Sequence, residues 1–261
     1  MKKRSTAPSV GRRQLLSAAA AVPMALTARE TSAFGEEGAF NPRLLLTGSA
    51  KPDTRRRTAP ARWSFELVRR TSAPARVSPT TVRADSAQLL SEPFAIWAGA
   101  GAPTPLTRAE LLGLRRFLVM GGILLVDEMN PKKPEFTRGA QQQIARVLPR
   151  GSAIAIGKEN VVFRSFYLLK RASGRLVVSD KLKAIVRGGV AQVLFSPNDL
   201  LGALAREAGG VYPLEAKPGG RMQREQAVRL AVNIGMYVLC SNYKDDQVHA
   251  PFLMRRRAER K

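Results

Sequence analysis

The residues with the greatest chemical potential are carboxylates that follow apolar runs. Asp127 and Glu128 come directly after one such run, and Asn198 and Asp199 follow another within a few residues. If both runs are strands of one parallel sheet, their carboxyl ends lie at the edge where open α/β sheets bind ligands. Carboxylate and amide oxygens are the ligands that Mg²⁺ and Ca²⁺ prefer. These four residues are therefore candidates for ligand or metal binding; a divalent cation is possible, and no other cofactor is predicted.

A structural role is the alternative for the same residues. A short polar side chain can cap a helix, because it accepts a hydrogen bond from the first free amides. The carboxylates can also form salt bridges with the abundant arginines. Capping alone accounts for Asn198 and Asp199, which favours the structural interpretation.

Cysteine- or serine-based catalysis finds little support in the sequence. The chain has one cysteine, Cys240, and one histidine, His249. An amidotransferase-type site needs a cysteine on a sharp strand-to-helix turn, together with a histidine and a carboxylate that activate it. Cys240 instead falls late in an apolar helical pattern, where a buried, inert thiol is expected. His249 follows a polar segment outside the predicted sheet, and no Gly-x-Ser-x-Gly motif occurs.

Residues 105–130 define the fold most clearly. Thr107 and Glu110 have the spacing of a capping box, and leucines at helical spacing follow them. Two consecutive glycines end the predicted helix. The apolar run at 123–126 comes next and is typical of a central parallel strand that is buried on both faces.

The rest of the chain alternates in the same way between strands and helices. This alternation predicts one α/β domain with a doubly wound, mostly parallel sheet and an antiparallel extension around residues 161–195. The Gly-Ala-Gly turn at 99–101 is only a weak phosphate-loop signal. Further strands are predicted at 44–46, 93–99, 153–156, 176–178, 184–186 and 193–195, and further helices at 63–70, 136–148, 200–207 and 224–240.

The chain is strongly basic. Its 43 Lys and Arg against 20 Asp and Glu give a formal net charge of +23. This balance indicates an anionic neighbour, such as a membrane surface, a cell-wall polymer or nucleic acid. Solvated arginines from a compositional bias are the alternative. Residues 51–62 are rich in arginine and are predicted to form an exposed loop.

The N-terminal segment has the features of an export signal. Arg12 and Arg13 precede two leucines, as in a twin-arginine motif, and an apolar run too short for a stable membrane span follows. Ala33 is the predicted cleavage site, with Ala28 as an earlier alternative. Cleavage after Ala33 removes six basic residues and one acidic residue and leaves a charge of +18. An amphipathic or disordered N-terminus is the alternative interpretation of this segment.

Four segments carry a family resemblance, through their order as much as through their residues. The chain resembles the bacterial family called domain of unknown function 4159 (DUF4159) over residues 40–254. The resemblance implies the class I glutamine-amidotransferase-like fold, a flavodoxin-like α/β sandwich, and it supplies no catalytic residue. Members of this family are often encoded near MoxR-type ATPases and von Willebrand-type proteins of bacterial envelope gene clusters. The four segments are Gly121–Glu128, Val162–Leu168, Phe195–Leu200 and Arg224–Tyr237.

Two functions from different classes follow from these observations. The favoured one is an exported, non-catalytic envelope protein that binds an envelope protein partner or an anionic envelope ligand within a MoxR/von Willebrand-type system. The alternative is a carboxylate- or metal-dependent hydrolase of envelope glycans. Nucleic acid is not expected as a partner, because export would separate the protein from it.

The predicted organisation has three parts. Residues 1–33 are a twin-arginine signal peptide, residues 34–254 are the α/β domain, and residues 255–261 are a basic tail. Arg229 and Asn233 interrupt the last apolar helix, so no transmembrane helix is predicted in the mature chain. The expected location is the periplasm or another compartment reached through the twin-arginine pathway.

Overall fold

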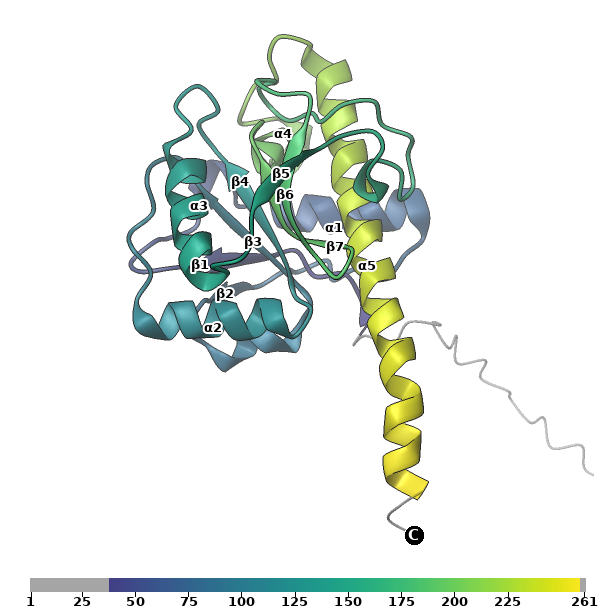
Figure 1. Ribbon diagram of the computed structural model, residues 1–261. Coiled ribbons are helices and arrows are strands. Elements are labelled where there is room, and N and C mark those ends of the chain that lie inside the picture. Colours follow the sequence, from purple (N-terminus) through teal and green to yellow (C-terminus); the bar gives the residue numbers. More distant parts are fainter. Residues whose placement is uncertain (1–37, 259–261) are drawn as a thin grey trace, which may run out of the picture. The chain divides into compact units, whose positions relative to one another are not determined.

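A seven-stranded sheet forms the centre of the structure, which is a computed structural model (Figure 1). The structure describes residues 38–258, with side chains through residue 241. The described residues belong to one compact unit. The predicted signal peptide, with Arg12, Arg13 and Ala33, lies outside the described residues and stays a prediction.

The sheet is mostly parallel, as the sequence predicts. Its spatial order is β2-β1-β3-β4-β7-β6-β5. The first five strands in this order are parallel to one another, whereas β6 is antiparallel to β7 and β5 is antiparallel to β6. The strands are β1 Arg43–Leu46, β2 Thr81–Arg83, β3 Phe94–Gly99, β4 Ile123–Glu128, β5 Ala153–Ile156, β6 Leu182–Arg187 and β7 Val190–Ser196.

The run at 176–178 is not a strand, so that prediction is wrong. Leu176 makes only an isolated bridge. The amides of Val178 and Ser179 donate to the side-chain oxygen of Asn198 at 2.9 and 3.1 Å. A polar side chain thus binds the amides that a strand would have used for ladder hydrogen bonds.

The winding of the chain changes direction between β1 and β3. From β1 the chain crosses to β2 on one side, and it then returns past β1 to β3 and β4 on the other side. Connections that leave neighbouring parallel strands in opposite directions open a crevice at the carboxyl ends of those strands. The topology therefore offers a ligand position at β1 and β3, in addition to the ends of β4 and β7.

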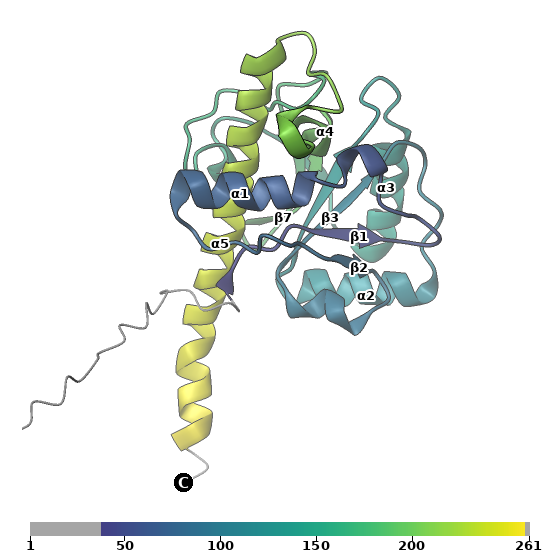
Figure 2. The same cartoon turned by 180° about the vertical axis from the view of Figure 1, so that it is seen from behind.

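Helices cover both faces of the sheet. On one face pack α1 (Ala59–Thr71), α4 (Leu200–Leu204) and α5 (Gly220–Ala258), and on the other pack α2 (Arg108–Val119) and α3 (Glu135–Val147). Figure 2 shows α1 crossing α5 on the first face. Each face of the sheet therefore has its own hydrophobic core.

β4 is buried along its whole length and connects the two cores. Leu124 and Val126 belong to the core under α2 and α3, whereas Ile123 and Leu125 belong to the core under α1 and α5. The preceding helix, α2, begins at the predicted capping box. The predicted central strand is therefore confirmed.

Two helices differ in length from the prediction for local reasons. α1 begins at Ala59 rather than at Trp63, because Pro60 lies in its first turn, where proline is tolerated. α4 ends at Leu204 rather than at residue 207, because Ala205 leaves the helical conformation with ψ 128°. Residues 59–62, which were predicted to belong to an exposed loop, therefore form the first turn of α1.

The last helix, α5, is longer than predicted, and this changes the environment of the only cysteine. The helix continues to residue 258 instead of ending at 240, and it includes residues 255–258 of the predicted tail. Its buried core residues end at Val238. Cys240 is exposed, so the prediction of a buried thiol is wrong. Within the described residues, no helix is both long and apolar enough to cross a membrane.

Candidate functional site

Asp127, at the carboxyl end of β4, binds the first turn of α4. Its side chain is fully buried. Its Oδ1 accepts the amide of Leu200 at 2.9 Å, and its Oδ2 accepts the amide of Leu201 at 2.8 Å. Burial, and then the nearby charge of Asp199, raise the pKa of Asp127 to about 7, although both amides favour the charged form. Asp127 thus caps the first turn of α4, although it comes from β4 and not from the residues just before that helix.

Asp199 occupies the sharp turn between β7 and α4. Its φ of 57° and ψ of 68° lie in the left-handed region, which non-glycine residues rarely adopt. Its buried carboxylate accepts the amide of Gly202 at 2.9 Å. Arg56 donates to both of its oxygens, at 2.9 and 2.6 Å, and Arg175 forms a second ion pair with it. The carboxylate therefore already has a helix amide and two guanidinium groups as partners.

Glu128 and Asn198 are also buried and bonded within the protein. Glu128 accepts the amides of Asn130 and Thr137, each at 2.9 Å, and so fixes the loop that leads into α3. Asn198 binds the loop at 178–179 through two accepted hydrogen bonds and one donated hydrogen bond. Since neighbouring residues on a strand point to opposite faces, Glu128 lies on the α3 side of the sheet. The structure therefore brings Asp127 and Asp199 together and leaves Glu128 apart.

The buried residues Asp127, Asp199 and Arg56, together with the partly buried Arg175, form a group that we call the β4/β7 network. With both aspartates ionised, its two carboxylates balance its two guanidinium groups. Among the side chains that the structure describes, residues 38–241, no group of three or more His, Cys, Asp or Glu could hold a metal ion. A cation entering the network would have to displace a guanidinium group from Asp199. Binding of a divalent cation stays a prediction.

Arg56 is the network residue that the sequence does not reveal. The predicted exposed loop at 51–62 is wrong at this position, because Arg56 is only 4% exposed. The side chain of Asp53 accepts both its amide and its guanidinium group, at 3.1 and 3.2 Å. The Asp-x-x-Arg spacing is the one local signal, and it does not distinguish a buried arginine from a surface pair. Arg175 has no comparable signal near it in the sequence.

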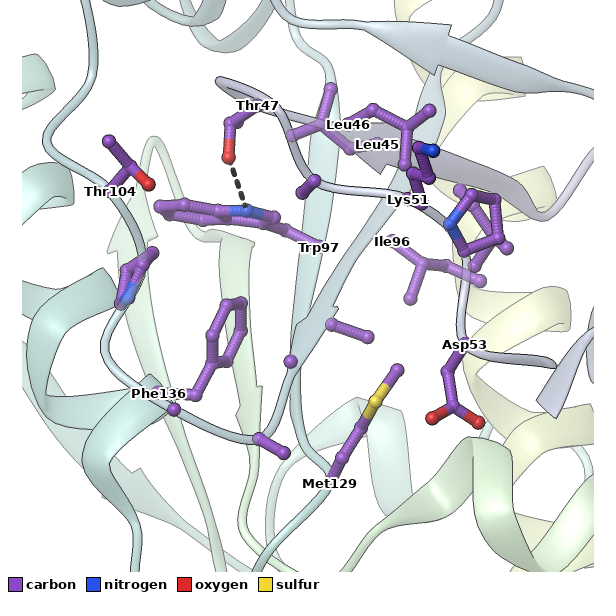
Figure 3. A pocket seen from close by; sticks show the side chains of 18 of the residues that line it. Leu45, Leu46, Thr47, Lys51, Asp53, Ile96, Trp97, Thr104, Met129 and Phe136 are labelled. Carbon is purple, nitrogen blue, oxygen red and sulfur yellow. Dashed lines mark hydrogen bonds between the residues drawn. The ribbon is translucent and has the colours of Figure 1, made fainter. Parts of the chain in front are cut away.

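A crevice opens where the winding changes direction, at the carboxyl ends of β1 and β3 (Figure 3). We call it the β1/β3 crevice. Its volume of about 400 Å³ lies in the range of small-molecule sites. The rings of Trp97 and Phe136 meet edge to face in it, with centroids 5.4 Å apart. The indole nitrogen of Trp97 donates to the hydroxyl of Thr47 at 3.3 Å, which fixes the ring in place.

The rim of the crevice is polar and adjoins the β4/β7 network. Figure 3 shows Lys51, Asp53 and Thr104 around the crevice, with Met129 near Asp53. Arg56 of the network donates to the carbonyl of Met129 at 3.2 Å and also binds Asp53. The buried network therefore holds one wall of the crevice in position.

The Gly-Ala-Gly turn at 99–101 also lines the crevice. A Cβ atom on Gly99 would lie 2.3 Å from the ring of Phe136, so this position has no room for a side chain. A Cβ atom on Gly101 would meet nothing within 4 Å. The first glycine therefore allows close packing of β3 against α3, and the turn needs no phosphate ligand to explain it.

The described lining of the crevice combines hydroxyl groups, two titratable side chains and an aromatic floor. It includes the hydroxyl groups of Thr47, Ser49 and Thr104, but neither cysteine nor histidine. A hydroxyl nucleophile needs an adjacent general base. Lys51 and Asp53 are the titratable side chains among the described lining residues. The arrangement offers an apolar, aromatic floor with a few polar groups at the rim, as ligand sites commonly do.

The comparison with protein families covers both the crevice and the network. A family model described as Domain of unknown function (DUF4159) matches residues 43–239, from β1 into α5. No curated protein matches the chain. The matched range is much more than half of the sequence and agrees with the resemblance seen in its motifs. The chain therefore belongs to the DUF4159 family.

Proposed function

We propose that the protein is a non-catalytic binding module of the bacterial envelope, and that the β1/β3 crevice holds its ligand or protein partner. The observation that supports this function best is the turn at Asp199. Its backbone has the strain expected of a nucleophile-bearing turn between a strand and a helix. Its side chain, however, is fully buried and paired with two arginines. A nucleophile has to reach its substrate, and this carboxylate does not.

The other candidate nucleophile supports the same proposal. Cys240 is exposed on α5 and is not among the residues that line the crevice. A cysteine activated for catalysis needs a histidine or another charged group beside it and a substrate pocket in front of it. The side chain of His249 lies beyond the described side chains. Binding in the crevice needs neither residue.

The finer fold class and the location are part of this proposal. The parallel strand order β2-β1-β3-β4-β7 supports a flavodoxin-like, amidotransferase-like class. Export rests on the twin-arginine pattern at Arg12 and Arg13 and on the small residues before Ala33. The expected partner is a component of a MoxR/von Willebrand-type system, because family members are often encoded beside such genes.

A bulky side chain at the rim of the crevice tests the binding function. Ala50 is exposed and lines the crevice, so Ala50→Phe should obstruct it without disturbing the core. Ala109→Phe is the matched control, because Ala109 is exposed on α2 and does not line the crevice. Each tagged protein is used to capture partners from envelope extracts, and bound material is quantified. A partner should bind wild type and the control but not Ala50→Phe.

Two results would contradict the proposal. Equal capture by Ala50→Phe and Ala109→Phe would show that the crevice is not the binding site. The alternative function is hydrolysis of envelope glycans by carboxylates or a metal ion. It predicts stoichiometric metal in the purified protein, or release of product from isolated glycan. Such hydrolysis should be abolished by Asp127→Asn in a protein that still folds. Observation of this activity would replace the binding function.

A further inference from the structure

A second concave surface lies between α1, the segment after α4 and the start of α5. We call it the arginine groove. Its volume is about 570 Å³, and seven arginines and two glutamates line it. Six of the arginines and both glutamates come from two helices that pack against each other, α1 and α5, whereas Arg206 comes from the segment after α4. This groove is lined by different residues from the β1/β3 crevice.

The two glutamates of the groove are fully engaged by arginines. Glu66 accepts hydrogen bonds from three arginines of α1, including Arg70 at 2.7 Å. Arg70 also forms a two-pronged hydrogen bond with Glu225, with both distances at 2.8 Å. Arg229 donates to the same Glu225 at 2.9 Å. Arg70, above all, lowers the pKa of Glu225 to about 2, so this carboxylate is ionised at neutral pH.

Three further arginines of the groove have no carboxylate within salt-bridge distance among the described residues. They are Arg206, Arg221 and Arg224. Arg224 is held by backbone carbonyls and lies 3.9 Å from the ring centroid of Tyr212. Arg206 lies over the same ring at 5.4 Å. These contacts orient the guanidinium groups without neutralising them.

The groove therefore carries a concentrated positive charge. Seven arginines against two glutamates leave an excess of five positive charges in one concavity. The start of α5 lies in the same groove, and the positive end of a helix dipole adds to this potential. Arginines on an ordinary solvated surface would be spread out and mobile. Here Glu66, Glu225 and Tyr212 hold several of them in place, which reduces the entropy lost when a ligand binds.

We propose that the arginine groove binds a ligand with two or more closely spaced phosphate groups. Guanidinium groups match phosphate oxygens through paired hydrogen bonds, and they do so better than lysine. A compact polyphosphate carries several negative charges in a small volume, as an excess of five positive charges requires. An isolated carboxylate would neutralise only one of them. This site is independent of the proposed function of the β1/β3 crevice.

The experiment uses sodium tripolyphosphate as the probe and isothermal titration in a phosphate-free buffer. The variant Arg206→Gln/Arg221→Gln removes two groove charges that no carboxylate needs. The control Arg108→Gln/Arg116→Gln removes two exposed charges from α2, on the opposite face of the sheet. Wild type and control should bind one equivalent with similar affinity, and affinity should fall as salt rises. The groove variant should bind at least about tenfold more weakly.

Absence of binding to wild type would overturn the proposal. An equal loss of affinity in the groove variant and the control would also overturn it, because the attraction would then be a property of the total charge. Thermal melting shows whether both variants fold. If the double variant does not fold, Arg221→Gln alone is used, since Arg221 is exposed and makes no ion pair in the described structure.

A second measurement separates a soluble polyphosphate from a phospholipid headgroup. The protein is sedimented with vesicles of phosphatidylglycerol and, as a reference, of phosphatidylcholine. Sedimentation with phosphatidylglycerol that tripolyphosphate prevents identifies headgroups as the phosphate source. Binding of tripolyphosphate without sedimentation identifies a soluble ligand. Sedimentation that the groove substitutions do not weaken, with no tripolyphosphate binding, would contradict the proposal.

Discussion

The β4/β7 network and the β1/β3 crevice both lie at the carboxyl ends of parallel strands of one sheet, yet they differ in what fills them. In the network, Asp127 and Asp199 are fully buried, and amides and arginines bind their oxygens. In the crevice, Trp97 and Phe136 form an aromatic floor below a polar rim, and about 400 Å³ remains unfilled. The carboxylate oxygens of the network already have hydrogen-bond partners within the protein, whereas the crevice has room for another molecule.

This difference shows that a carboxylate at the end of a strand is not by itself a ligand site. The turn into α4 leaves free amides, and Asp127 binds two of them across the sheet. The crevice arises instead from topology, because the connections of β1 and β3 leave in opposite directions. Arg56 links the two regions, since it binds Asp199 on one side and the carbonyl of Met129 on the other. The network therefore holds one wall of the crevice in position, but its two carboxylates do not line the crevice.

The largest expected effect is the loss of Arg56. Arg56→Met should destabilise the protein by about 3–5 kcal/mol, because it leaves the buried Asp199 with only Arg175 as a cationic partner. Arg55→Met is the matched control, because Arg55 is exposed, and should change stability by less than about 0.5 kcal/mol. Urea unfolding of both variants measures the difference. Equal, small effects would show that the network is not a structural unit.

The second prediction concerns the pH dependence of the network. Burial and Asp199 raise the pKa of Asp127 from its ordinary value to about 7, so the folded chain binds this proton more tightly than the unfolded chain. The stability contributed by this group is therefore fully present below about pH 4 and is lost as pH rises towards 7. The loss should be at most about 1.4 kcal/mol per pH unit.

Other carboxylates have the opposite dependence, so the test compares two proteins. The pKa values of Glu66 and Glu225 are lowered by their arginine partners despite burial, and their contributions are lost as pH falls. Asp127→Asn leaves Glu66 and Glu225 unchanged and removes the titration of Asp127, together with its interaction with Asp199. Wild type minus Asp127→Asn should lose stability between pH 4 and 7. A difference that does not change over this range would show that Asp127 stays ionised in the fold.

The central strand and the helix before it were predicted well from the sequence, because both depend on local patterns. The apolar run at 123–126 and the capping box at Thr107 are complete within a few residues, and both were confirmed. The strand order and the crevice depend on which strands pair, which no local pattern specifies. The run at 176–178 shows the limit, because the side chain of Asn198 competes for its amides.

The candidate site was harder to predict than the fold. The sequence identified Asp127 and Asp199 as neighbours, but it did not identify Arg56, 143 residues away from Asp199. A buried carboxylate requires a cationic partner, and a chain with 43 basic residues offers too many candidates to choose one. Trp97 and Phe136 read as ordinary core residues in the sequence, and only the topology places them in a crevice.

A single hydrogen bond inside the crevice gives a smaller expected effect. Thr47→Val removes the acceptor of the Trp97 indole, which is buried, and should cost about 1–3 kcal/mol, near the lower limit because the bond is 3.3 Å long. Thr104→Val makes the same chemical change at the exposed rim and should change stability by less than about 0.5 kcal/mol. In a Trp63→Phe background, the emission of Trp97 should shift only in Thr47→Val. An equal response of both variants would place Trp97 outside a defined crevice.

The smallest expected effect is at Cys240, and it separates packing from chemistry. Because the thiol is exposed on α5, Cys240→Ala creates no cavity and should change the unfolding free energy by less than about 0.5 kcal/mol. The native protein should react with a thiol reagent as fast as the unfolded chain, whereas a buried thiol would react only after unfolding. Partner capture in the crevice should be the same as for wild type. If Cys240→Ala folds normally but captures no partner, the thiol takes part in function. Binding in the β1/β3 crevice would then not be enough to explain the activity of the protein.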